Sequence, residues 1–60
     1  MKAIAKFIEH CSNAQTIANE IAMICDDHLG NTPDEINWGH VGDAARIERL
    51  LSEILDSIKQ

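Results

Sequence analysis

The sequence predicts an all-α protein, an antiparallel two-helix hairpin that dimerises into a four-helix bundle. Three observations predict it. Apolar residues recur every three or four positions along two segments, about 3–29 and 38–58, and turn-forming residues fill the loop 30–37 between them. The third observation is size, because a chain of 60 residues seldom buries a core that is stable alone. We therefore expect one domain over residues 1–60, completed by another chain.

The first helix is expected from about Ala3 to Leu29. At 100° per residue its apolar side chains cover an arc of about 200°, wider than the roughly 100° stripe of a helix that faces one core. A single neighbouring helix is therefore too little to cover it. The segment Ser12-Asn13-Ala14-Gln15 resembles a capping box, so a break near Cys11 is the alternative. The unbroken apolar spacing from Phe7 to Ala18 favours one continuous helix.

The loop carries a helix stop followed by a helix start. Gly30 can adopt the left-handed conformation that ends a helix. Thr32-Pro33-Asp34-Glu35 has the pattern of a capping box with proline in the first turn, although the helix it opens can last a single turn. Asn37 is a second possible cap. The second helix then runs from about Trp38 to Ile58, with these apolar residues on one face: Val41, Ala44, Ile47, Leu51, Ile54, Leu55 and Ile58.

Small residues run through the middle of the apolar arc on the first helix. They are spaced evenly about Ala18, so an antiparallel crossing of two copies centred there sets Cys11 of one chain against Cys25 of the other. Small side chains at i±4 spacing permit short distances between helix axes. The expected dimer interface is formed by Cys11, Ala14, Ala18, Ala22 and Cys25.

Charge and hydropathy narrow the classes of function. The net charge is −5, with ten acidic and five basic residues, which disfavours binding to a phosphate backbone. A nucleic-acid-binding hairpin is the alternative, and it requires a basic stripe formed by Lys2, Lys6, Arg46, Arg49 and Lys59. No apolar run suits a signal peptide or a membrane span. We expect a cytoplasmic protein with reduced thiols.

Few residues offer material for catalysis, which needs a nucleophile, base or metal in a sheltered cleft. We expect no enzymatic activity and no cofactor. A small metal site is a weaker alternative, with Cys25 and His28 on adjacent turns, Asp26 or Asp27 beside them and His40 across the loop. A single Cys-x-x-His pair often occurs by chance, so a half-buried cysteine beside solvated polar groups is favoured.

Carboxylates and the only tryptophan gather around the predicted bend. Asp34 and Glu35 fall in a first helical turn, where the helix dipole favours negative charge, whereas Asp26 and Asp27 fall in a last turn, where it does not. Trp38 is expected to pack over the open end of the hairpin near Leu29 and Val41. Tryptophan is also enriched at binding hot spots. The candidate partner-binding residues are therefore Asp26, Asp27, Asp34, Glu35 and Trp38.

The segment from Asn31 to Leu55 reads NTPDEINWGHVGDAARIERLLSEIL. It resembles the C-terminal half of short hypothetical proteins of bacteriophages and other mobile elements, in which a Pro-Asp-x-x-Asn-Trp-Gly-x-Val-Gly bend leads into an amphipathic helix. The resemblance implies a small phage-type protein that acts by binding. It makes an acidic inhibitor of a host defence protein, such as an anti-CRISPR protein, the leading hypothesis. The expected shape is also similar to the hairpin dimer that controls plasmid copy number by binding RNA, a likeness of fold alone.

Overall fold

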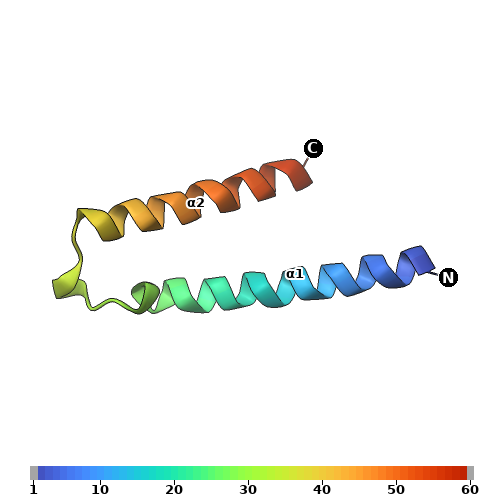
Figure 1. The fold of residues 1–60 in the computed structure, drawn as a ribbon, viewed down its shortest axis with the longest axis horizontal. Helices are drawn as coiled ribbons and strands as arrows, with labels where there is room; N and C mark the ends of the chain where they lie inside the picture. Colours follow the sequence, from blue (N-terminus) through green and yellow to red (C-terminus); the bar gives the residue numbers. More distant parts are fainter. Residues whose placement is uncertain (1, 60) are drawn as a thin grey trace.

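The computed structural model describes residues 2–59 and consists of two antiparallel helices joined by a bend (Figure 1). The elements are α1 (Lys2–Asp26), the 3₁₀ turns η1 (His28–Gly30) and η2 (Pro33–Glu35), and α2 (Trp38–Ile58). The all-α prediction is confirmed, as are the limits of the second helix. Met1 and Gln60, which the predicted domain includes, lie outside the described residues.

The first helix is continuous, so the alternative of a break near Cys11 is wrong. Inside α1 the Thr16 Oγ1 donates a hydrogen bond to the Ser12 carbonyl oxygen at 3.1 Å, a bond within the helix that replaces capping. The helix ends at Asp26 rather than at Leu29. The polar residues at 12–16 therefore lie on the exposed surface of an uninterrupted helix.

The early end of α1 follows from a run of left-handed residues. Gly30 has φ 81° as expected, but His28 and Leu29 precede it at φ 58° and 56°. Non-glycine residues in this region cost roughly 1–2 kcal/mol each. The Asn31 side-chain amide donates to the carbonyl oxygens of His28 and Leu29 at 3.3 and 3.4 Å, which holds the turn. This turn places Leu29 beside α2, where it lines the space between the helices.

Asn37, and not Thr32, caps the second helix. The N–H groups of Gly39 and His40 donate to Asn37 Oδ1 at 2.9 and 3.2 Å, and the Asn37 N–H donates to His40 Nδ1 at 3.1 Å. These bonds form a reciprocal capping box with histidine in the place of the usual glutamate. Thr32 does occupy the N-cap position of η2 with Pro33 in the first turn, as predicted, and η2 lasts a single turn that ends at an extended Ile36. The predicted capping box is wrong, because the Thr32 side chain makes no capping hydrogen bond.

We expect Asn37→Ala to lower the free energy of unfolding by about 1 kcal/mol, because two helix N–H groups lose their acceptor. Thr32→Ala is the matched control and should change it by less than about 0.5 kcal/mol. Urea unfolding followed by circular dichroism, at one fixed protein concentration, measures both. Equal effects of the two substitutions would contradict the assignment of the cap.

The two helices run side by side without packing closely. Within residues 2–59, no Cα atom of α1 lies within 8 Å of a Cα atom of α2, and no side chain is buried. The radius of gyration is 15.3 Å, against about 10 Å for a compact chain of this length. The accessible surface is 5366 Å², against about 3,900 Å² for a compact monomer of this mass. The hairpin is therefore open, with its apolar faces aligned and uncovered.

Candidate functional site

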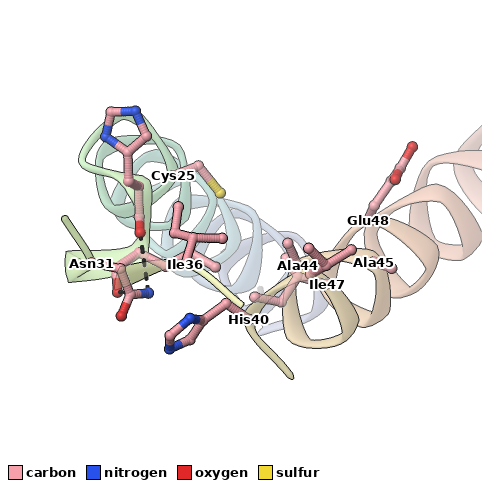
Figure 2. Close-up of a pocket in the computed structure, with 11 residues that line it drawn as sticks. Cys25, Asn31, Ile36, His40, Ala44, Ala45, Ile47 and Glu48 are labelled. Atoms are coloured by element: carbon pink, nitrogen blue, oxygen red, sulfur yellow. Dashed lines mark hydrogen bonds between the residues drawn. The ribbon is translucent and has the colours of Figure 1, made fainter. Parts of the chain in front are cut away.

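An apolar groove follows one side of the hairpin between α1 and α2. It consists of a hollow of about 440 Å³ at the bend, shown in Figure 2, and a second of about 310 Å³ that reaches Leu55. The two hollows share Cys25, Ala44, Ile47 and Glu48. Small side chains at Ala44 and Ala45 leave the α2 wall of the groove low, so the groove has the shape and chemistry to take another helix.

At another place between the helices, large aliphatic side chains of α1 and α2 face one another. They surround a third hollow of about 350 Å³. Its lining residues are Ile21, Ile24, Leu29, Ile47, Leu50, Leu51 and Ile54. Even here exposure stays high, with Leu51 37% and Ile54 56% exposed. The aliphatic side chains of the two helices therefore face one another, but no group within residues 2–59 covers them.

The predicted dimer-interface residues lie on one exposed face of α1. Cys11, Ala14, Ala18 and Ala22 are all exposed, and Cys25 is both exposed and part of the groove wall. Both cysteines are free thiols. The small-residue face thus meets the groove at Cys25.

The predicted partner-binding residues gather at the bend and are exposed. Asp26 ends α1, Asp27 precedes η1, Asp34 and Glu35 lie in η2, and Trp38 begins α2. Within residues 2–59, none of these four carboxylates makes a hydrogen bond or an ion pair, and the last turn of α1 carries no basic residue. Negative charge at a helix C-terminus is unfavourable, so an approaching cationic group would be attracted here.

Trp38 is 85% exposed, and the prediction that it packs against Leu29 and Val41 is wrong for the single chain. The reason lies in the cap. Asn37 fixes Trp38 as the first residue of α2, about 160° around the helix from Ile54. Ile54 faces α1, so Trp38 projects away from the space between the helices. An indole ring held in water on a rigid helix end is well placed for contact with another molecule.

The alternative metal site is not assembled. Cys25, His28 and His40 line the same hollow, but within residues 2–59 no three His, Cys, Asp or Glu side chains come together in a group that could hold a metal ion. One nitrogen of His40 is already used, because Nδ1 accepts the Asn37 N–H. Cys25, His28 and His40 therefore contribute to the wall of the groove and do not form a metal site within residues 2–59.

Two of the basic residues that the nucleic-acid-binding alternative requires lie beside acidic side chains. Lys6 lies 3.3 Å from a Glu9 oxygen and Arg49 lies 4.0 Å from a Glu53 oxygen. Exposed pairs of this kind contribute less than about 1 kcal/mol, but they place negative charge beside the positive charge. Over the described residues, neither helix is long and apolar enough to cross a membrane.

Comparison with protein-family models, with characterised proteins and with solved structures finds no match to this chain. The site therefore has to be understood from its own geometry. Sequence reasoning missed the groove residues Ala45 and Glu48, and it counted Ile4, Phe7 and Ile8 in the apolar arc of the first helix without assigning them to a site. The available signal was the difference in length between the helices, which are 25 and 21 residues long.

Proposed function

We propose that this chain is a non-enzymatic protein-binding module that works as a twofold dimer, a four-helix bundle. The observation that supports it is the absence of any buried side chain within residues 2–59. An open hairpin of this kind has no core to offset the conformational entropy of ordering about sixty residues. A second copy supplies the missing apolar surface, because each copy offers the same uncovered faces.

The exposed area fits this proposal. The accessible surface of 5366 Å² exceeds that of a compact monomer by about 1,500 Å². If each of two chains covers that excess, the dimer buries about 3,000 Å², which lies within the range of roughly 2,000–5,000 Å² for obligate homodimers. The small-residue face from Cys11 to Cys25 and the adjoining groove are the surfaces that we assign to this contact.

The bend is the surface that we assign to a foreign protein. In an antiparallel dimer the two bends lie at opposite ends, and Trp38 faces away from the bundle, so each remains accessible. The unpaired carboxylates beside Trp38 favour a partner with basic side chains at its surface. The resemblance of residues 31–55 to phage-type proteins supports a role as an inhibitor of a host defence protein, of the kind that anti-CRISPR proteins represent.

We expect Trp38→Ala to separate folding from binding. The substitution should change the free energy of unfolding by less than about 0.5 kcal/mol, because the ring is 85% exposed. It should also abolish capture of a protein partner from a bacterial lysate, since tryptophan at the centre of a contact often contributes 2 kcal/mol or more. Urea unfolding and affinity capture with mass spectrometry, run in parallel, measure the two effects.

Met23→Ala is the control, because Met23 is 72% exposed on α1, about 140° around the helix from Ala18, and should affect neither measurement. A loss of several kcal/mol in Trp38→Ala would show that the ring is buried in the dimer and is not a binding surface. Capture of RNA or DNA that weakens steeply between low and moderate salt would favour the nucleic-acid alternative instead. Both wild-type and variant proteins should be compared in that salt series.

A further inference from the structure

The N-terminal part of α1 has no partner within the chain. Ile24 and Ile21 share a hollow with Leu51 and Ile54, and an antiparallel register with these pairs opposite one another places Ile58 near the level of Ile17. Figure 1 shows the same relation, with α1 extending well past the C-terminal end of α2. We call residues 2–11 the overhang. Ile4, Phe7 and Ile8 within it are 59, 64 and 59% exposed.

The overhang points its apolar side chains along the small-residue face, and not toward α2. At 100° per residue, Ile4, Phe7 and Ile8 lie within about 80° of Ala18 around the helix. Ile17 and Ile24, which belong to the edge that faces α2, lie about 100–120° from Ala18, on the side opposite to Ile4 and Ile8, and Phe7 lies about 20° from Ala18 between the two groups. A longer α2 would therefore still leave Ile4 and Ile8 uncovered. The surface that covers the overhang is therefore the one that packs against the small-residue face.

The twofold register connects the overhang to the bend. In an antiparallel crossing centred on Ala18, facing residues have numbers that sum to 36, so Asp26, the last residue of α1, faces His10 of the other copy. Phe7 then lies about one turn beyond Asp26, at the bend that carries Leu29. Leu29 lines the hollow of about 440 Å³ at the bend, together with Ile36, Val41 and Ala44. A hollow of this size is within the range that encloses a small organic molecule, so it has room for an aromatic ring and a neighbouring aliphatic side chain.

We infer that the overhang of a second copy fills the bend hollow, with Phe7 seated beside Leu29 and Val41, once on each side of the dimer. The inference rests on the proposed dimer and adds its key contact. It gives a role to the greater length of α1, to the apolar face of the overhang and to the left-handed turn at His28 and Leu29. That turn forms the wall of the hollow that receives the ring.

The first test is the dimer dissociation constant, measured by sedimentation equilibrium. Phe7→Ala should raise it at least about 100-fold, because two buried aromatic rings are lost in each dimer. Phe7→Leu, which keeps most of the apolar volume, should raise it much less. Met23→Ala removes exposed apolar surface from the far side of α1 and should leave it unchanged. Equal dissociation constants for wild type and Phe7→Ala would overturn the inference.

A second test uses a disulfide between the two chains, and it does not depend on whether Phe7→Ala folds. In a chain carrying Cys11→Ala and Cys25→Ala, the pair Phe7→Cys and Val41→Cys should give a covalent dimer with oxidised glutathione, which is reduced to two molecules of glutathione for each disulfide formed. Within one chain the eighteen residues from Phe7 to Cys25 span about 27 Å, so a bond between positions 7 and 41 must join two chains. The control pair, Phe7→Cys with Ile58→Cys, should not cross-link.

The outcomes separate the inference from the proposed function. A wild-type protein that is folded and monomeric at all concentrations overturns the proposed dimer and the inference with it. A dimer that cross-links through Cys11 and Cys25 but not through positions 7 and 41 keeps the proposed dimer and overturns the inference. Cross-linking of Phe7→Cys alone to its own copy indicates a parallel pair of helices and overturns both.

Discussion

Ala18→Glu should abolish the dimer and most of the helical structure with it. Ala18 lies on the twofold axis of the proposed contact, where it faces its own copy. Glutamate there would place two carboxylates together in an apolar contact, and burying unpaired charge costs several kcal/mol per group. The released chain keeps no core, because no side chain within residues 2–59 is buried by the hairpin alone.

Light scattering after size-exclusion chromatography and far-ultraviolet circular dichroism together test this expectation. Thr16→Glu is the matched control, because it adds the same charge two residues away but about 160° around the helix. It should remain dimeric and helical. A folded, monomeric Ala18→Glu protein would end the proposal of an obligate dimer and would leave the small-residue face free for a foreign partner.

Oxidation of the wild-type protein should give a covalent dimer through Cys11 of one chain and Cys25 of the other, and should make its unfolding independent of concentration. The proposed dimer unfolds to two separate chains, so its thermal midpoint rises with protein concentration. A disulfide between the chains makes unfolding unimolecular and removes that dependence. Thermal melts of the reduced and oxidised protein over a hundredfold range of concentration measure the effect.

The single-cysteine variants Cys11→Ala and Cys25→Ala are the controls. Each variant keeps one cysteine per chain, at the same position in both chains. In the antiparallel dimer these two thiols are fourteen residues and about 21 Å apart, too far for a disulfide. Neither variant should cross-link under the same conditions. Cross-linking of either variant at the wild-type rate would instead indicate random collision, and would remove this support for the Ala18-centred crossing.

The sequence by itself determined the two helices and the kind of bend between them. Apolar spacing of three and four gave the continuity of α1 through Ser12 and both limits of α2, because helical periodicity is a property of neighbouring residues. Gly30 in the left-handed region and the capping residues in the loop are equally local. The small-residue face follows from the same periodicity, since its residues are positions on one predicted helix.

Only the tertiary structure decided how these elements relate in space. α1 ends at Asp26, because His28 and Leu29 adopt left-handed conformations that turn the chain toward α2. The apolar periodicity does not reveal this conformational cost. Asn37 caps α2 in preference to Thr32, and this choice turns Trp38 outward. The spacing of the helices and the overhang depend on which residues face across the bend. The spacing and the overhang are long-range relations, which sequence patterns do not record. The turn and the cap are local, but each is a choice among competing hydrogen bonds that the sequence pattern leaves open.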